Sequence, residues 1–145
     1  MKGAYCLIIS VLSEMNLQVG SLGVKTFQPG TYVYVGSALN GLEARINRHI
    51  RTSFGANVRP HWHVDYLLRR RETRLQEVWF KEAEKREECL IAREVLEHGS
   101  PIKGFGCSDC DCISHLFRVQ DTGFLEALGL KPWKEKLYAS VPSNF

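Results

Sequence analysis

The chain has 145 residues, of which 44% are hydrophobic and 24% are charged, and its net charge is +3. This length and balance favour one globular domain with a full core and exclude a strongly basic, histone-like chain. The sequence contains no apolar run of about 18 residues, so a membrane span is not expected. Five cysteines and no signal-peptide pattern predict reduced thiols in a cytoplasmic protein.

The first part of the chain is rich in strand-forming residues and turns. Apolar and β-branched runs predict strands over residues 4–12, 17–20 and 31–36. Asn40-Gly41 predicts a turn. The spacing of Leu42, Ile46 and Ile50 predicts a helix over residues 42–52, followed by a polar loop over 54–59.

The second part alternates helices and strands. The patterns predict a helix from Pro60 to residue 70, a strand over 75–81, a helix over 82–98, an irregular segment over 103–113, a strand over 114–120 and a short final helix from Asp121 or Thr122 to residue 128. This mixture predicts a small α/β or α+β domain built on a short sheet. We expect a single domain over 1–145, with a core over about 1–98 and a Cys-rich extension over about 99–145.

Two tyrosines lie on predicted strands. Tyr5 is on the first, and Tyr34 precedes Gly36 at the end of the third. If these strands pair, the two phenols can converge on one face of the sheet. A phenol can orient a water molecule or take its proton. Strand tyrosines that simply reach solvent are the common alternative.

The predicted helix over 42–52 is basic. Arg45 and His49 are four residues apart and share a face, while Arg48 and Arg51 lie on neighbouring faces. The planar guanidinium of Arg45 suits a phosphate, and Arg45 begins close to the strand that carries Tyr34. For Arg48 and Arg51, a solvated basic face is the simpler interpretation.

The segment Pro60-His-Trp-His-Val-Asp-Tyr66 concentrates histidines and aromatic residues. On a helix, His61 and Asp65 share a face and His63 lies elsewhere. Contact of His61 or His63 with a phosphate is one interpretation. A packed aromatic cluster with a His–Asp hydrogen bond is the other.

An acidic residue lies near the apolar side of the predicted helix over 82–98. The apolar arc comprises Cys89, Ile91, Ala92, Val95 and Leu96. Glu88 lies about 40° from the centre of this arc, whereas Glu87 lies on the opposite side. A carboxylate on a buried face needs a cation to compensate it. One carboxylate is enough for Mg²⁺, which keeps several waters, so we predict Glu88 as a metal ligand.

A Cys-rich run contains four possible zinc ligands, Cys107, Cys110, Cys112 and His115. Structural zinc sites normally bring two short ligand pairs together across a longer loop. Here all four ligands come from nine consecutive residues. Structural zinc is therefore not expected, and we predict a glycine-turned loop with reduced thiols. A catalytic cysteine with His115 is a further alternative, although no feature indicates a lowered thiol pKa.

In this order and spacing, the motifs resemble a GIY-YIG nuclease domain. Gly3-Ala4-Tyr5 stands where that family has Gly-Ile-Tyr, and Tyr34-Val35-Gly36 stands where it has Tyr-Ile-Gly. The His-Trp-His-x-Asp-Tyr and Gly-Phe-Gly-Cys-Ser-Asp-Cys segments resemble the Uri-type branch. The stretch between Tyr5 and Tyr34 is long for the family, with an extra segment around residues 17–30, which leaves the strand register open.

The resemblance implies a three-stranded antiparallel sheet flanked by helices and enlarged by the Cys-rich segment. It also implies metal-dependent hydrolysis of phosphodiester bonds of DNA, in repair or recombination. Glu88 would bind Mg²⁺ or Mn²⁺, although a Glu-x-x-Leu-Ile alignment selects Glu87. Tyr5 would activate water and Arg45 would stabilise the developing charge. The other expected site residues are Tyr34 with one of His49, His61 or His63 around the phosphate, and Gly36, Ser37, Arg48, Arg51, Arg59 and Arg69 to Arg71 toward nucleic acid.

Two other functions stay open. One is a non-catalytic nucleic-acid-binding module of the same fold, which would bind DNA without cutting it. The other is a zinc-binding interaction domain built on the cysteine run, which would unfold on chelation.

Overall fold

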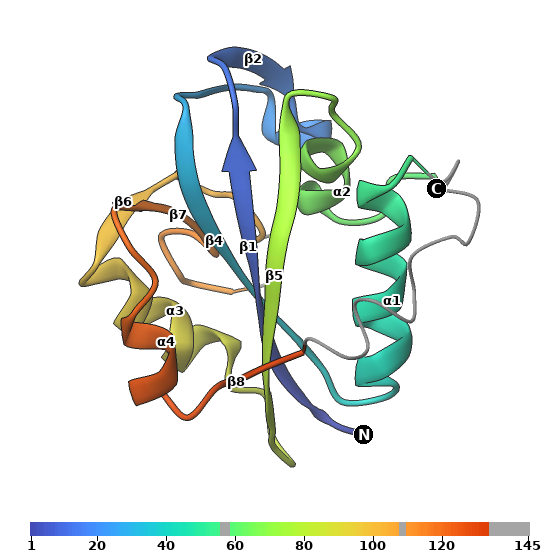
Figure 1. Ribbon diagram of the computed structural model, residues 1–145, viewed down its shortest axis with the longest axis vertical. Coiled ribbons are helices and arrows are strands. Elements are labelled where there is room, and N and C mark those ends of the chain that lie inside the picture. Colours follow the sequence, from blue (N-terminus) through green and yellow to red (C-terminus); the bar gives the residue numbers. More distant parts are fainter. Residues whose placement is uncertain (56–58, 108–109, 134–145) are drawn as a thin grey trace.

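The computed structural model describes residues 1–55, 59–107 and 110–133. Within these residues, six strands form an antiparallel sheet in the order β6-β7-β4-β1-β5-β8 (Figure 1). The elements are β1 (Gly3–Val11), β2 (Met15–Gln18), the 3-10 turn η1 (Gly20–Leu22), β3 (Val24–Phe27), β4 (Gly30–Ala38), α1 (Leu42–Ser53), α2 (His63–Leu68), β5 (Thr73–Glu82), α3 (Glu88–Leu96), β6 (Gly99–Pro101), β7 (Leu116–Val119), α4 (Phe124–Ala127) and β8 (Lys131–Pro132). The predicted mixed α+β fold is confirmed, but the sheet has six strands rather than the three that the resemblance implies, because β6, β7 and β8 extend it at both edges.

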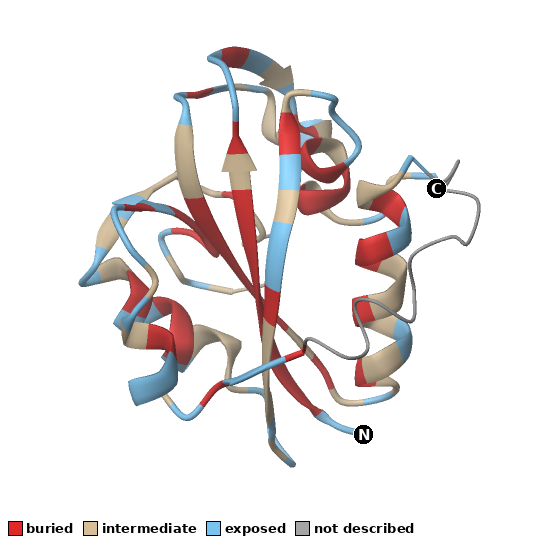
Figure 2. Cartoon of the chain, viewed as in Figure 1, coloured by how far each residue is buried: buried red, intermediate tan, exposed pale blue. Residues whose placement is uncertain are grey.

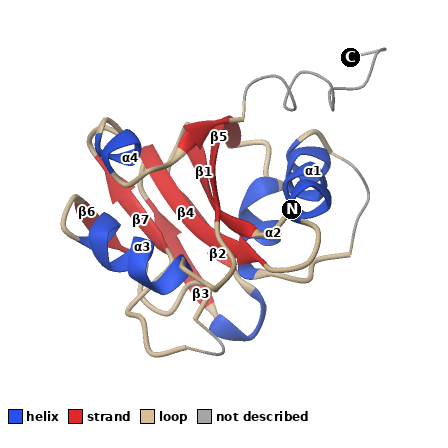
Figure 3. Cartoon of the chain, turned by 90° about the horizontal axis from the view of Figure 1, so that it is seen from below, coloured by secondary structure: helices blue, strands red, loops and turns tan. Residues whose placement is uncertain are grey.

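Helices cover both faces of the sheet (Figure 3). Apolar residues of α1 and α2 pack on one face, together with Tyr5, Leu7 and Ile9 of β1. Apolar residues of α3 and α4 pack on the other, against Cys6 and Ile8. Strands β1 and β4 therefore run through the buried centre of the molecule, which Figure 2 shows as a continuous band. Burial on both faces explains why β1 is mainly apolar over residues 4–9 rather than alternating.

The register of β1 and β4 brings the two tyrosines together. Tyr5 is opposite Gly36 and Leu7 is opposite Tyr34, so both phenols lie on the face covered by α1 and α2. A Cβ atom on Gly36 would lie 2.5 Å from the ring of Tyr5, so only glycine leaves space for this ring. The extra segment before β4 folds into a separate β2–β3 hairpin and does not disturb the register.

The predicted helix over residues 82–98 is wrong in its first part. Strand β5 continues to Glu82, which is paired with Gly3, and the amide of Ala83 donates to the carbonyl oxygen of Lys2 at 3.0 Å. The helix begins only at Glu88. Residues 82–87 have high helix propensity, but pairing with the central strand overrides this preference at the start of the segment.

Other boundaries shift by a few residues. The short strand predicted over 17–20 lies at 15–18, and its partner β3 was not predicted. Helix α2 begins at His63 rather than at Pro60, and the strand predicted over 114–120 is limited to 116–119. The final helix starts after Gly123, whose amide donates to the side chain of Asp121 at 3.1 Å.

The predicted Cys-rich extension completes the sheet of the predicted core. Strand β7 pairs with residues 31–34 of β4, and β6 pairs with β7. The last residues of the extension lie outside the described part of the chain. None of the described helices is both long and apolar enough to cross a membrane.

Candidate active site

A cavity of about 430 Å³ opens where β7 stops pairing with β4. The sheet contributes tyrosines, α1 contributes an arginine, the segment at the start of α2 contributes histidines and α3 contributes a carboxylate. The lining comprises Tyr5, Tyr34, Val35, Gly36, Ser37, Arg45, His61, Trp62, His63, Arg86, Glu88, Gly106 and His115. Most of the predicted site residues thus meet in one place.

His49 does not line the cavity, but it lies behind Tyr5 and is hydrogen-bonded to the Tyr5 hydroxyl. Its Nε2 atom lies 2.7 Å from the Tyr5 hydroxyl, and both side chains are buried. Burial lowers the pKa of His49 to about 3, against the opposing effect of Asp65, so the imidazole is neutral at pH 7. Burial also raises the pKa of Tyr5, with Arg45 acting in the opposite direction. A neutral His49 can accept the Tyr5 proton on Nε2 when its hydrogen is on Nδ1.

Asp65 lies on the other side of His49. Its Oδ1 atom is 4.0 Å from His49 Nδ1, which has no hydrogen-bond partner among the described residues. This distance is too long for a hydrogen bond, but the negative charge favours the tautomer with a hydrogen on Nδ1. The order Asp65, His49, Tyr5 therefore prepares Nε2 to accept a hydrogen bond from the Tyr5 hydroxyl.

The buried His49 predicts acid-sensitive stability. An unfolded histidine titrates near pH 6.5, and the folded pKa of about 3 is lower. Between these values only the unfolded state binds the proton, so this contribution is full above about pH 6.5 and is lost as the pH falls toward about 3. Urea unfolding at pH 7 and pH 5 should therefore show a smaller loss of stability in His49→Gln than in the wild type. His61→Gln, which changes an exposed residue, should keep the wild-type loss; an equal loss in all three proteins contradicts the assignment.

Arg45 reaches the cavity from α1. Its guanidinium stacks on the Trp62 ring at 4.1 Å, and Nη1 donates to the carbonyl oxygen of Ser37 at 3.2 Å. Stacking holds the planar group while leaving in-plane donors for an anion. The cavity thus contains a positioned cation beside the hydroxyl of Tyr5.

Arg48 and Asp65 support this wall of the cavity. Both oxygens of the buried Asp65 accept from Arg48 Nη1 at 3.0 Å, and Arg48 Nη2 donates to the carbonyl oxygen of Arg59. Asp65 also accepts from the backbone amides of His61 and Trp62, so it caps α2. The expected His–Asp hydrogen bond therefore involves the backbone of His61. The guanidinium of Arg48 is engaged within the protein, whereas Arg51, Arg59 and Arg69 to Arg71 are exposed.

His63 is held in one tautomer by the loop between β6 and β7, which is called the Cys-rich loop below. The amide of Gly106 donates to His63 Nδ1 at 2.8 Å, so the hydrogen of the neutral imidazole is on Nε2. Burial lowers the pKa of His63, which also favours the neutral form. Gly106 has a φ of +77°, a left-handed conformation that glycine adopts readily. His63 is therefore prepared as a neutral hydrogen-bond donor in the cavity wall.

The structure separates the two adjacent glutamates. Glu88 lines the cavity with only 15% of its side chain exposed, and it accepts a hydrogen bond from the hydroxyl of Ser37. Arg86 lies 3.8 Å from its other oxygen. Glu87 instead pairs with Lys81 at 3.0 Å, outside the cavity. The helical periodicity thus predicted that Glu88, rather than Glu87, lies toward the interior. The prediction holds because α3 is a regular helix from Glu88 onward.

A second group of side chains could hold a metal ion beside this cavity. The ligand atoms of Cys89, Cys110, Cys112 and His115 all lie within 4.8 Å of one another. The set of possible ligands considered from the sequence differs in one member, because Cys107 is not part of this group and its thiol donates to the carbonyl oxygen of Phe105. Zinc was not expected because all candidate ligands came from one run, and Cys89 on α3 removes that reason.

These thiols are not prepared as nucleophiles. Burial and the neighbouring thiols of Cys112 and Cys110 raise the pKa of Cys89 to about 12. Burial is also the main cause that raises the pKa of Cys112. A protonated thiol is a poor nucleophile, so the cluster does not support a catalytic cysteine with His115.

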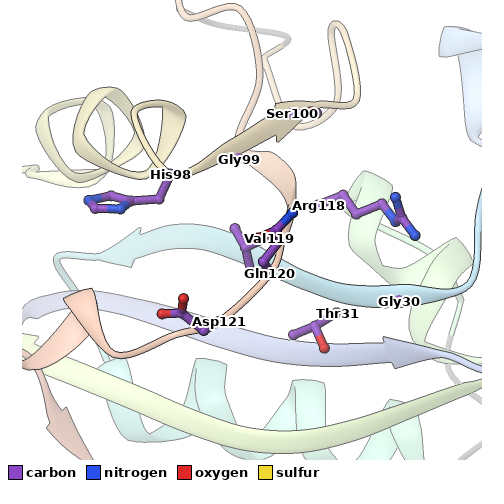
Figure 4. A pocket seen from close by; sticks show the side chains of 9 residues that line it. All are labelled: Gly30, Thr31, His98, Gly99, Ser100, Arg118, Val119, Gln120 and Asp121. Atoms are coloured by element: carbon purple, nitrogen blue, oxygen red, sulfur yellow. The ribbon is translucent and has the colours of Figure 1, made fainter.

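A larger cavity of about 710 Å³ lies elsewhere in the molecule (Figure 4). Figure 4 shows side chains from the ends of β4 and β7 and from the turn between α3 and β6 around it. Among its lining residues only Asp121 has a carboxylate, which accepts from the amide of Gly123, and none is a tyrosine. The smaller cavity, which has the convergent polar groups, is therefore the better candidate for an active site, although it is not the larger of the two.

The fold and the cavity define an α+β domain with a polar site of tyrosine, arginine, histidine and glutamate. Over residues 4–131 the chain matches the family described as "Domain of unknown function DUF123", and it belongs to this family. The matched span includes all residues of the cavity and of the Cys/His cluster. No curated protein and no solved structure matches the chain significantly.

Proposed function

We propose that this protein is a metal-dependent endonuclease of the GIY-YIG type that hydrolyses phosphodiester bonds of DNA, in repair or recombination. One observation carries the proposal: Tyr5, Arg45 and Glu88, from three separate elements, converge on one cavity. A phenol that orients water, a cation for phosphate and a carboxylate for a metal ion are groups that suit this hydrolysis.

Tyr5, held by His49, would orient the attacking water. Tyr5 lines the cavity, and its hydroxyl is 2.7 Å from His49 Nε2. The Tyr5 oxygen would accept a hydrogen bond from the water and direct it toward phosphorus, while the phenolic hydrogen is donated to His49 Nε2. Burial raises the pKa of Tyr5 and lowers the pKa of His49 to about 3, so both side chains stay neutral. Asp65 favours the His49 tautomer that accepts from Tyr5.

Arg45 and His63 would hold the phosphate. The guanidinium donors of Arg45 can neutralise a phosphate oxygen and the charge that develops on it, and such electrostatic stabilisation accounts for most of the rate enhancement in many enzymes. His63 Nε2–H can donate to a second oxygen or to the leaving group. Tyr34, whose ring lies 6.4 Å from that of Tyr5, lines the same wall and limits where the phosphate can sit.

The residues around Glu88 fit a hard divalent cation. Its carboxylate faces the cavity, and oxygen donors with room for water and phosphate are what Mg²⁺ and Mn²⁺ prefer. Glu88 would hold the ion from α3, with the Ser37 hydroxyl orienting the carboxylate. When bound, the ion supplies Lewis-acid stabilisation of the charge on the phosphate.

We further propose that the protein works in the cytoplasm. All five cysteines are free of disulfides, and thiols persist in a reducing compartment.

The test is a panel of end-labelled substrates with and without Mg²⁺ or Mn²⁺. The panel should include single-stranded DNA, plain duplex, flaps, four-way junctions and the matching RNA forms. We expect metal-dependent cleavage of at least one DNA form. Salt-sensitive binding with no cleavage under either metal would contradict the proposal and support a binding module.

Arg45 provides a more specific prediction. Arg45→Ala should lower the single-turnover cleavage rate by about 10²–10³-fold, because it removes a donor for the transition-state charge. Arg51→Ala removes an exposed arginine from the same helix and should weaken DNA binding at most. Measured with protein in saturating excess over DNA, the Arg51 variant should cut at nearly the wild-type rate. Equal rates for the two variants would remove Arg45 from the proposed site.

A further inference from the structure

We propose that Cys89, Cys110, Cys112 and His115 bind a structural Zn²⁺ ion that fastens the Cys-rich loop to the start of α3. The four ligand atoms are already grouped, all within 4.8 Å of one another. This inference concerns a second metal site, distinct from the Glu88 carboxylate, and does not depend on the proposed nuclease activity.

The spacing of the ligand atoms suits tetrahedral zinc. The sulfur atoms of Cys89 and Cys110 lie 3.8 Å and 3.5 Å from His115 Nε2. In a tetrahedral site with Zn–S of about 2.3 Å and Zn–N of about 2.0–2.1 Å, a sulfur and a nitrogen ligand are about 3.5–3.6 Å apart. Only small side-chain movements separate this arrangement from a coordinated one.

The donor set indicates zinc rather than a harder or clustered metal. Three thiolates and one imidazole form the Cys₃His set of closed structural zinc sites. Magnesium and calcium prefer oxygen ligands, and iron–sulfur clusters usually take four cysteines. Protein side chains supply all four positions, which leaves no open position for substrate and indicates a structural role.

Two of the ligands are positioned before any metal binds. Cys89 lies in the first turn of α3. The amide of His115 donates to the carbonyl oxygen of Phe105, and its carbonyl oxygen accepts from the amide of Val35. Cys110 and Cys112 lie in a loop without regular secondary structure. Zinc would therefore join two ligands that the fold holds in place, Cys89 and His115, to two ligands from this loop. This role accounts for the cysteines of the loop.

The zinc site would also position the candidate active site. Cys89 directly follows Glu88, and the loop that ends at His115 contains Gly106, the partner of His63. Zinc thus connects the helix that presents the carboxylate to the loop that orients the histidine. We infer that its loss would loosen Glu88 and His63 together, although neither residue is a zinc ligand.

The experiment measures zinc by mass spectrometry in the full chain, purified without chelator. Wild type and Cys107→Ser should each contain close to one zinc per chain, and Cys89→Ser and Cys112→Ser should lose it. Cys107 is the matched control, since it lies in the same loop outside the cluster. Loss of zinc in Cys107→Ser and Cys112→Ser, with zinc kept in Cys89→Ser, would indicate the ligand set considered from the sequence and overturn the proposal.

Cobalt substitution of the wild-type chain keeps the test valid if the cysteine variants fail to fold. Replacing zinc with Co²⁺ should produce thiolate-to-cobalt charge transfer and the visible absorption of a tetrahedral site. Removing the metal should lower the melting temperature, and added Zn²⁺ should restore it. A wild-type chain that contains no zinc, shows no such absorption with Co²⁺ and has an unchanged melting temperature would overturn the proposal. None of these readouts requires cleavage, so they remain informative if the chain is not a nuclease.

Discussion

Glu88→Gln is expected to lower metal-dependent cleavage by at least about 10²-fold, because the variant loses the charged ligand for the cation. Glutamine has nearly the same size and can still accept a hydrogen bond from Ser37, so the cavity should keep its shape. DNA binding without Mg²⁺ should stay near the wild-type level, or become tighter, because a negative charge facing the phosphate has been removed.

Glu87→Gln is the matched control for this prediction. Glu87 is the adjacent acidic residue, but its carboxylate pairs with Lys81 outside the cavity. A partly exposed ion pair of this kind contributes little to stability. We therefore expect cleavage by Glu87→Gln at close to the wild-type rate. If Glu87→Gln lost activity and Glu88→Gln kept it, the choice of metal ligand would be reversed.

Asp65→Ala is expected to lower the free energy of unfolding by about 3–5 kcal/mol. The substitution leaves the partly buried Arg48 guanidinium without its carboxylate and removes the acceptor for two backbone amides before α2. Loss of a helix cap alone costs about 1 kcal/mol, so the unpaired charge is the larger effect. Urea unfolding at pH 7 measures this change.

Glu72→Gln compares the fully buried Asp65 with an acidic residue that is only partly buried. Glu72 pairs with the exposed Arg70, so its replacement should change the urea midpoint little. Asp65→Asn, which keeps the shape and one carbonyl acceptor, should be less destabilised than Asp65→Ala. A small effect for Asp65→Ala would mean that Asp65 does not fasten α1 to the start of α2.

The central strands and much of the site were predictable because their signals are local. The apolar runs of β1 and β4 indicate buried strands, and Tyr5, Tyr34 and Arg45 lie at positions that match a known pattern of motifs. Glu88 was distinguished from Glu87 by helical phase alone, and the structure places only Glu88 in the cavity.

The features that sequence reasoning missed depend on contacts between distant segments. Cys89 was assigned to the apolar arc of a helix, and nothing local indicates that it meets Cys110 and His115 across the fold. Asp65 was considered only with its neighbour His61, yet Arg48 of α1 is its main partner. The extension of β5 to Glu82 likewise depends on pairing with β1 and contradicts local helix propensity.

Zinc in the second site would affect how the proposed nuclease activity is assayed. A strong chelator would remove a zinc ion as well as a cation bound at Glu88, so loss of cleavage on chelation would not identify the site responsible. Leaving Mg²⁺ and Mn²⁺ out of the buffer removes only the weakly bound cation.

The most direct measurement is single-turnover cleavage of a labelled DNA that the wild-type chain binds, with Mg²⁺ present or left out. We expect cutting only with the metal ion, with the rate lost in Glu88→Gln and kept in Glu87→Gln while both variants still bind the DNA. A wild-type chain that binds the DNA but leaves it intact with Mg²⁺ and with Mn²⁺, or a Glu88→Gln variant that cuts at the wild-type rate, would contradict the proposed function.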